Sequence, residues 1–162
     1  MVNLKFVRVN KDNFDEFSQF ILLSEEVFPD SLAMSLNDYK DIASNDRSVC
    51  FVLFLGDDYV GNVFGCPLIE EFEQNQDAPV FDGCIYWYNI VVLSSFQGRG
   101  FGFLLAEKFI ESCKDEGFKF VSGNFRLNGS YKLAKKFNVV FERVIENWEG
   151  SGEDFVYCVI KL

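Results

Sequence analysis

The sequence predicts an α/β fold with a central mixed, mostly antiparallel sheet of about seven strands flanked by about four helices. The apolar patterns follow the order strand-helix-helix-strand-strand-strand-helix-strand-helix-strand-strand. Runs of adjacent strands early and late in the chain disfavour an all-parallel, doubly wound sheet. The 162 residues are 49% hydrophobic and include 20 Phe, which is enough for the core of one domain spanning residues 1–162.

The N-terminal elements follow from alternation and from helical spacing. Residues 3–9 alternate between apolar and polar side chains well enough to predict a short strand. A helix is expected from a cap at Asn10 or Asp12 to about residue 27, and Pro29 stops it. Its apolar stripe consists of Phe14, Phe17, Ile21 and Leu22.

A second, shorter helix and a hairpin are expected next. Ser35 caps the helix, whose apolar stripe consists of Leu36, Tyr39 and Ile42. Residues 49–55 and 59–68 are rich in β-branched and aromatic side chains, and Gly56-Asp57-Asp58 between them is a turn signal. These two segments are therefore expected to pair as an antiparallel hairpin.

The second half of the chain starts with an acidic, polar segment at residues 70–79, which is expected to be an exposed loop. Two helices are expected, one at residues 100–116 that Gly117 ends and one at residues 129–137 that Asn128 caps. Strands are expected at residues 84–93, 118–122, 139–146 and 155–162.

The charge balance narrows the classes of function. Lys and Arg number 15 and Asp and Glu number 25, so the formal charge is −10, which disfavours a broad nucleic-acid-binding surface. The same excess of acidic residues would favour a cationic small molecule or a basic peptide as ligand. It is explained equally well by solubility alone. The chain has no His, which excludes Ser-His-Asp and Cys-His catalytic groups and removes the commonest metal ligand. No metal site is expected.

The cysteines and the apolar runs indicate an intracellular protein. The five cysteines are odd in number and form no C-x-x-C pair, so reduced core side chains are expected rather than disulfides or a zinc site. They are Cys50, Cys66, Cys84, Cys113 and Cys158. The longest apolar run, residues 49–55, is too short to span a bilayer, and the first residues carry charges where a signal peptide would be apolar. A cytoplasmic location without membrane association is expected.

A glycine-rich turn carries the functional signal. Gln97-Gly98-Arg99-Gly100-Phe101-Gly102 lies between an expected strand and an expected helix. Glycine allows positive φ and close approach of a ligand, and a helix start presents unpaired N–H groups to an anion, so the turn suits a phosphate or pyrophosphate. The Walker spacing is absent, and a dinucleotide motif from Gly98 would need a glycine where Phe103 stands. NTP and NAD binding are therefore not supported.

The same six residues match Gln/Arg-x-x-Gly-x-Gly/Ala, and with the element order they make the chain resemble the GNAT (GCN5-related) N-acetyltransferase family. The resemblance implies acetyl-CoA as co-substrate. The backbone of Ile90, Val91 and Val92 would pair with its pantetheine arm, and the turn would cradle its pyrophosphate. A backbone N–H near Val92 would stabilise the oxyanion while an acceptor amine attacks directly in a ternary complex.

A second family signature is matched less fully. It consists of an Asn, a proton-donating Tyr two helical turns later, and then Gly-Phe. Counted from Asn128, which also caps the expected helix, the Tyr position holds Lys135, and the resemblance assigns Asn128 and Lys135 to the CoA site. Counted from Asn124, the Tyr position holds Tyr131, although Gly-Phe is then missing. Tyr131 is therefore a nearby alternative acid.

The general base of the family is also unmatched. Histone-acetylating relatives carry a Glu on the fourth strand at the position of Tyr86, and a Tyr near its ordinary pKa of about 10 is a poor base at neutral pH. Tyr86 thus remains a candidate catalytic residue, and water or a carboxylate of Glu70, Glu71 or Asp82 is the alternative base.

The family places its acceptor between the first two helices, the fourth strand and the last hairpin. Those regions hold aromatic and acidic side chains that favour an amine cation: Phe28, Asp30, Tyr39, Tyr86, Tyr88, Trp148 and Glu149. The expected function is acetyl transfer to a primary amine, either a small cationic amine or an amine of a protein or peptide. The alternative is a catalytically silent module of the same fold that binds CoA or a protein partner. Dimerisation through an exposed last strand is a further family-level expectation.

Overall fold

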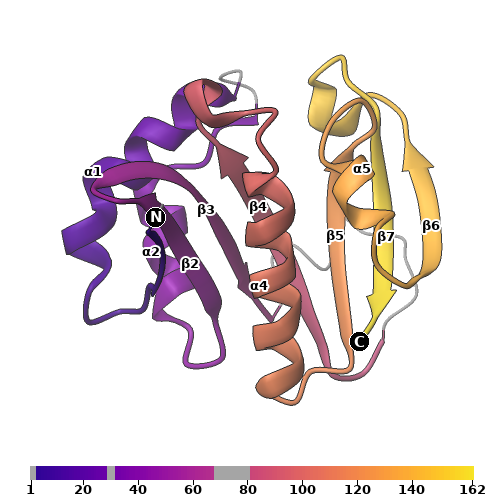
Figure 1. The fold of residues 1–162 in the computed structure, drawn as a ribbon. Helices are drawn as coiled ribbons and strands as arrows, with labels where there is room; N and C mark the ends of the chain where they lie inside the picture. The colour runs from indigo at the N-terminus through magenta and orange to yellow at the C-terminus, as the bar shows by residue number, and fades with distance from the viewer. Residues whose placement is uncertain (1–2, 29–31, 68–80) are drawn as a thin grey trace.

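The structure is a computed structural model that describes residues 3–28, 32–67 and 81–162. Seven strands form one sheet in the order β1-β2-β3-β4-β5-β7-β6 (Figure 1). The strands are β1 (Leu4–Arg8), β2 (Val49–Leu55), β3 (Asp58–Cys66), β4 (Cys84–Val92), β5 (Phe120–Arg126), β6 (Val139–Ile145) and β7 (Phe155–Lys161). Only β4 and β5 pair in parallel in this sheet, so the prediction of a mixed, mostly antiparallel sheet is confirmed.

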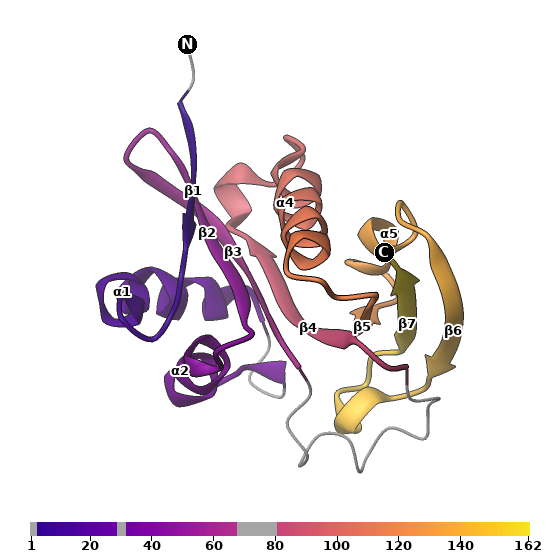
Figure 2. The ribbon, with the colours of Figure 1, turned by 90° about the horizontal axis from the view of Figure 1, so that it is seen from below.

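Helices cover both faces of the sheet (Figure 2). The α-helices are α1 (Phe14–Ser24), α2 (Leu36–Ser44), α4 (Phe101–Asp115) and α5 (Tyr131–Ala134), and short 3₁₀ segments are η1 (Glu25–Val27), η3 (Ser94–Phe96) and η4 (Trp148–Gly150). The helices α1 and α2 lie on one face and α4 lies on the other. Strand β2 packs against both layers, with Val49, Phe51 and Leu53 in the core under α4 and Cys50 and Val52 in the core under α1 and α2. This double burial explains the unbroken apolar run of β2.

The start of α1 differs from the expected cap. Asn10 Oδ1 accepts bonds from the N–H groups of Asp12 and Asn13 at 2.8 and 3.2 Å, and Asn13 Oδ1 accepts a bond from the N–H of Asn10 at 2.8 Å. These residues form a turn ahead of the helix, so Asn13, rather than Asn10 or Asp12, occupies the cap position. After Ser24 the chain tightens into η1, which ends at the predicted residue 27.

The predicted cap of α2 and the predicted hairpin are confirmed. Ser35 Oγ accepts a bond from the N–H of Asp38 at 3.1 Å, and Asp38 Oδ2 accepts one from the N–H of Ser35 at 2.8 Å, which is a capping box. Strands β2 and β3 pair antiparallel across the turn at Gly56. The loop predicted at residues 70–79 lies outside the described residues.

The connection from α4 to β5 corrects the predicted start of the fifth strand. Gly117 has a φ of 86° and donates its N–H to Lys114 O, while Phe118 donates to Cys113 O. This pattern is a Schellman motif, so Phe118 belongs to the end of the helix, and β5 starts at Phe120 instead of residue 118. The strand then extends to Arg126, beyond the predicted end at residue 122.

The helix predicted at residues 129–137 with Asn128 as its cap is wrong in extent and in its cap. The α-helix α5 spans Tyr131–Ala134 and Ser130 occupies its N-cap position. The N–H of Gly129 bonds to Arg126 O at 3.0 Å, and Ser130 Oγ accepts a bond from the N–H of Arg126 at 3.2 Å. The first i→i+4 bond of the helix runs from Ala134 N to Ser130 O at 3.2 Å, so the α-helix begins after Ser130 and not after Asn128.

The position of the last strand is a further correction. Strand β7 lies between β5 and β6, and its residues 155–160 are buried. The edge strand on this side of the sheet is β6, on which Val140 and Val144 are exposed. The expectation that the last strand is exposed is wrong, because β7 already has a partner on each side, and dimerisation itself stays a prediction.

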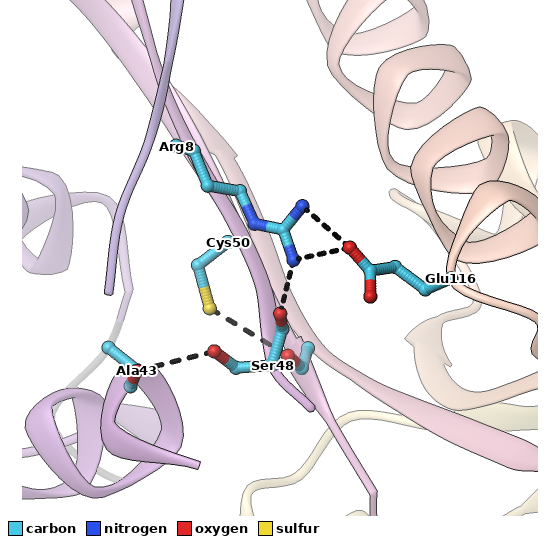
Figure 3. Close-up of polar contacts among 6 residues, drawn as sticks. Arg8, Ala43, Ser48, Cys50 and Glu116 are labelled. Carbon is cyan, nitrogen blue, oxygen red and sulfur yellow. Dashed lines mark hydrogen bonds and ion pairs between the residues drawn. The ribbon is translucent and has the colours of Figure 1, made fainter. Parts of the chain in front are cut away.

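A polar cluster joins both layers near the C-terminal end of α4 (Figure 3). The Arg8 guanidinium donates to Ser48 O at 2.6 Å and to Glu116 Oε1 at 3.3 Å. Ser48 Oγ donates to Ala43 O at 3.2 Å, and Cys50 Sγ donates weakly to a backbone carbonyl of β3 at 3.7 Å. These bonds tie β1, the start of β2 and the ends of two helices together.

The cysteines are free thiols, as predicted. Four of them are buried and Cys84 is partly exposed. Burial raises the pKa of the Cys50 thiol to about 12, so this group stays neutral at physiological pH. None of the helices in the described residues is both long enough and apolar enough to cross a membrane.

Candidate active site

The fourth strand contains a β-bulge at Tyr88. Phe64 of β3 pairs with Asn89 and Gly65 pairs with Trp87, which leaves Tyr88 without an opposite residue on β3. The indole Nε1 of Trp87 donates to Asn89 O at 3.0 Å and braces the bulge. Bulges re-aim side chains and bend strands, so this one sets the direction of the rest of β4.

Strands β4 and β5 diverge immediately after the bulge. Their parallel pairing runs from Cys84 with Phe120 to Trp87 with Gly123 and then stops, and the two strands separate beyond it (Figure 1). At the last pair, the Phe125 ring packs edge-on against Trp87 at 5.2 Å between ring centroids. The backbone of residues 89–92 on the side facing β5 therefore has no strand partner among the described residues. Such a strand edge can pair with an extended ligand.

The glycine-rich turn follows the open end of β4. Gly98 and Gly100 have φ values of 75° and 86°, which only glycine adopts readily. The first backbone bond of α4 runs from Leu104 N to Gly100 O, so the N–H groups of Phe101 and of the next residues point out of the helix end. With the helix dipole they form a place for an anion. Pyrophosphate chemistry therefore fits the residues present.

Two predicted residues of the turn have visible partners. Gln97 Nε2 donates to Val92 O at 2.9 Å, which ties the turn to the last residue of β4. The exposed Arg99 guanidinium lies 5.6 and 5.2 Å from the ring centroids of Phe96 and Phe101. Gln97 thus shapes the turn through the backbone, and Arg99 places a positive charge beside it.

A cavity of about 620 Å³ lies on the α1 and α2 side of the sheet, beside the divergence of β4 and β5. It gathers six residues that the sequence suggested for acceptor binding: Phe28, Tyr39, Tyr86, Tyr88, Trp148 and Glu149. Asp30 lies outside the described residues. The ring of Trp148 stacks on Phe155 with centroids 5.8 Å apart. The volume is typical of a site for a small molecule.

The cavity wall includes a hydrogen-bonded chain that sequence reasoning did not find. Tyr39 donates its hydroxyl hydrogen to Glu25 Oε1, and Asn89 Nδ2 donates to the Tyr39 hydroxyl oxygen. Glu25 Oε2 accepts a further bond from Met34 N at 2.8 Å. Burial raises the pKa of the Glu25 carboxyl, although the bonds from Tyr39 and Met34 oppose the shift. Asn89 interrupts an otherwise apolar and aromatic strand, which was the available sequence signal.

A second amide and one cation complete the wall. Asn124 of β5 donates to the Tyr86 hydroxyl across the gap between the strands. Arg126 also lines the cavity, and its Nη2 donates to Glu153 Oε1 and Oε2 at 2.7 and 2.9 Å. From the sequence, Asn124 was a candidate only as an alternative start of the second signature.

The remaining predicted residues lie elsewhere. Tyr131 does not line the cavity, and it donates its hydroxyl hydrogen to Glu142 Oε2 of β6 at 2.6 Å, a bond that raises the pKa of Tyr131 to about 12. Lys135 Nζ lies 4.7 Å from the centroid of the Tyr131 ring. Asn128 is exposed in the turn before α5. Of the alternative bases, Asp82 is exposed, and Glu70 and Glu71 lie outside the described residues.

The raised pKa of Glu25 predicts a pH-dependent stability difference. Between the ordinary carboxyl pKa of about 4.3 and the raised value, the folded protein binds more protons at this residue than the unfolded chain does. The contribution of Glu25 to stability is therefore lost as pH rises through this window. The unfolding free energy of Glu25→Gln should gain on that of the wild type from pH 4 towards neutrality, as measured by urea unfolding. Glu26→Gln, at the exposed neighbouring residue, is the control for the substitution itself. A difference for Glu25→Gln that does not change with pH would contradict the prediction.

Comparisons with known proteins were made on sequence and on structure. The family model described as "Acetyltransferase (GNAT) family" matches residues 12–135. No relative was found among curated protein sequences.

Three solved structures illustrate the structural likeness. The ribosomal-protein-S18-alanine N-acetyltransferase of Escherichia coli has a TM-score of 0.69 and 16% identity, and the match covers 98% of this chain and 94% of that one. A polyamine N-acetyltransferase of Drosophila melanogaster has a TM-score of 0.73 and 14% identity, covering 99% and 100%. A Bacillus subtilis acetyltransferase in complex with CoA has a TM-score of 0.58 and 16% identity, covering 100% and 99%. At these identities the structures establish the shared fold.

Proposed function

The chain belongs to the GNAT family of acetyltransferases, and on that premise we propose that it transfers the acetyl group of acetyl-CoA to a primary amine. One observation carries the proposal. The divergence of β4 and β5 leaves a strand edge unpaired beside an acidic, aromatic cavity, and the start of α4, whose free N–H groups suit an anion, follows that edge. An anionic donor and a cationic acceptor therefore have separate, adjoining places.

On the donor side, acetyl-CoA supplies an activated acetyl thioester. The backbone of Ile90, Val91 and Val92 would bind its extended arm, and the turn from Gln97 through Gly98, Arg99, Gly100, Phe101 and Gly102 would bind its pyrophosphate. Arg99, Asn128 and Lys135 would contribute from exposed positions. The positive charges of Arg99 and Lys135 and the positive end of the helix dipole offset locally a formal charge of −10, which otherwise repels an anion.

On the acceptor side, the cavity would orient the amine for direct attack in a ternary complex. Positioning of two bound reactants supplies a large part of the rate enhancement in such reactions. A backbone N–H near Val92 would stabilise negative charge that develops on the acyl oxygen. Tyr86 faces the acceptor, and Tyr131 is the proposed proton donor to the departing thiolate. Cytoplasmic acetyl transfer suits a chain with five free cysteines.

Isothermal titration calorimetry with acetyl-CoA, followed by thiol release with amine acceptors, tests the proposal. We expect binding in the micromolar range that is common for enzyme substrates, and acetyl-dependent thiol release with at least one amine. The panel should contain polyamines, aminoglycosides and basic peptides. Absence of acetyl-CoA binding at high micromolar ligand would contradict the proposal, as would CoA binding without turnover of any acceptor.

The proposed role of Tyr131 predicts different effects on kcat for substitutions of Tyr131 and of its hydrogen-bond partner Glu142. Tyr131→Phe should lower kcat by about tenfold or more, because a positioned acid is lost. Glu142→Gln should preserve or raise kcat, because it removes the carboxylate that holds the hydroxyl and raises its pKa. Both variants are compared by steady-state kinetics at saturating acetyl-CoA. An unchanged kcat in Tyr131→Phe would exclude this acid and leave Tyr86 as the candidate, which Tyr86→Phe then tests.

A further inference from the structure

The two strands that diverge beside the cavity contribute no carboxylate to it. Strands β4 and β5 contain no Asp or Glu, and Tyr86, at the position of the family's base, is a phenol with an ordinary pKa of about 10. A carboxylate that takes a proton from the acceptor amine must therefore reach the cavity from another element. The described lining residues include four carboxylates: Glu25, Asp38, Asp41 and Glu149.

Glu25 differs from the other three carboxylates in burial and in its connection to β4. Its side chain is partly buried, whereas the other three are exposed. Its Oε1 accepts the hydroxyl hydrogen of Tyr39, and the Tyr39 oxygen accepts a bond from Asn89 Nδ2. Asn89 is the first residue of β4 after the bulge, where the pairing with β5 has ended. The Glu25 carboxylate is therefore held two hydrogen bonds away from the strand edge proposed to bind acetyl-CoA.

The same bonds fix the Glu25 carboxylate and leave it able to accept a proton. Oε1 and Oε2 each accept one bond, from the Tyr39 hydroxyl and from Met34 N at 2.8 Å. The two oxygens of a carboxylate have about four lone-pair sites, so capacity for a further donor remains. A general base needs such fixed placement, because proton transfer requires the heavy atoms to lie within hydrogen-bond reach of each other or of one shared water.

The surroundings of Glu25 increase its affinity for a proton. Burial raises the pKa of its carboxyl, the bonds from Tyr39 and Met34 oppose the rise, and repulsion from Asp38 adds to it. A carboxylate with a raised pKa accepts a proton more readily than an exposed one. The other titratable or charged groups among the described lining residues are Asp38, Tyr39 and Asp41 of α2, Tyr86 and Tyr88 of β4, Arg126 of β5 and Glu149 of η4.

We infer that Glu25 is the general base of the transfer and takes a proton from the acceptor ammonium, directly or through one water molecule. The inference rests on the proposed function, because it assigns a catalytic residue of that same site. The freed lone pair of the amine forms the C–N bond at the acyl carbon, and the C–S bond breaks with its electron pair on sulfur. Tyr131 gives a proton to the sulfur and regains one from the amide nitrogen, while Glu25 releases its proton to solvent. The net products are the amide, CoA and one proton.

The pH dependence of kcat/KM in matched variants tests the inference, with spermidine, kanamycin and a lysine-containing peptide as acceptors. In the wild type, kcat/KM should fall about tenfold per pH unit below the pKa of Glu25, because a protonated carboxyl cannot act as the base. Glu25→Gln should lower kcat/KM at neutral pH by at least about a hundredfold and should lack this acid limb. Glu26→Gln, at the exposed neighbouring residue, should keep the wild-type rate and pH profile.

Two further variants separate a catalytic base from a merely structural carboxylate. Glu25→Asp keeps a titratable group on a side chain one methylene shorter, so the acid limb should remain while the rate falls. Tyr39→Phe removes a bond that lowers the pKa of Glu25, so the acid limb should move to higher pH. Calorimetry should still show acetyl-CoA binding to Glu25→Gln, which reports a folded protein with an intact donor site.

The outcomes distinguish this inference from the proposed function. If the wild type acetylates no amine, the proposed function fails and the inference fails with it. If the wild type is active and Glu25→Gln retains both the rate and the acid limb, acetyl transfer stands and the assignment of the base to Glu25 is overturned. An acid limb that is lost in Glu149→Gln instead would also overturn it. An acid limb that is absent from Glu25→Gln and shifted in Tyr39→Phe would support it.

Discussion

Gly100→Glu should weaken acetyl-CoA binding by at least about a hundredfold while the protein stays folded. Gly100 caps α4 with a φ of 86°, next to the amides proposed to bind the pyrophosphate. A carboxylate there would occupy the anion position and repel the phosphates, and loss of charge-assisted bonds worth about 3 kcal/mol corresponds to roughly a hundredfold. Calorimetry with acetyl-CoA measures the effect directly.

Gly117→Glu is the matched control at the other end of the same helix. Gly117 also has a φ of 86°, and at neither glycine would an added Cβ meet a heavy atom within 4 Å, so both variants impose the same backbone strain of about 1–2 kcal/mol. A carboxylate is favourable at a helix N-terminus and unfavourable at its C-terminus, so Gly100→Glu should be the more stable variant. If Gly100→Glu binds acetyl-CoA more weakly than Gly117→Glu although it is the more stable variant, its loss of affinity arises at the pyrophosphate site and not from unfolding. Equal affinities in the two variants would contradict the placement of the pyrophosphate.

Gly61→Ala should be the most destabilising methyl addition in the sheet, lowering the unfolding free energy by about 3 kcal/mol or more. A Cβ on Gly61 would lie 2.0 Å from Val91 O, a backbone atom of the neighbouring strand β4 that cannot rotate away. The pairing of Gly61 with Val92 would have to open, and this distorts the strand edge proposed for the donor. Urea unfolding and acetyl-CoA calorimetry on the same variant should therefore both show losses.

Gly102→Ala is the control for an added methyl group near the same strand. Its Cβ would meet Leu133 Cδ1 at 3.5 Å and Val92 Cγ2 at 3.8 Å, which are ordinary contacts, and alanine favours the helix by about 1 kcal/mol over glycine. This variant should be at least as stable as the wild type. Similar stabilities for Gly61→Ala and the wild type would show that β3 and β4 are more loosely paired than the structure indicates.

Local sequence signals predicted the elements whose stabilising contacts are local. The capping box of Ser35 and the turn at Gly56 each involve residues within a few positions of one another. The glycine-rich turn belongs with them, because Gly98 and Gly100 adopt positive φ for reasons of backbone sterics alone. Such features can be predicted from the sequence without knowing the rest of the fold.

The wrong expectations concern contacts that residue spacing alone does not reveal. The Asn128 cap fails for a local reason, because Arg126 and Ser130 close a turn around it. The last strand is interior because β6 pairs on its outer side, and periodicity carries no information about strand order. The acceptor residues were found by region through the family resemblance, whereas the chain of Glu25, Tyr39 and Asn89 was not found, since its members are 14 and 50 residues apart.

The sequence by itself determined the element order, the buried apolar strands and a turn shaped for an anion, because these depend on backbone conformation and hydrophobic spacing. Only the tertiary structure decided which polar groups share the cavity and which of them are already bonded. The structure assigns the acidic excess to particular positions. Most acidic side chains of the described residues are exposed. Glu25 is instead held by bonds from Tyr39 and Met34, next to Asn89, whose Oδ1 has no partner within the described residues. Hydrogen bonding and desolvation act between neighbours in space, so the chemistry of the site appears only after folding brings these residues together.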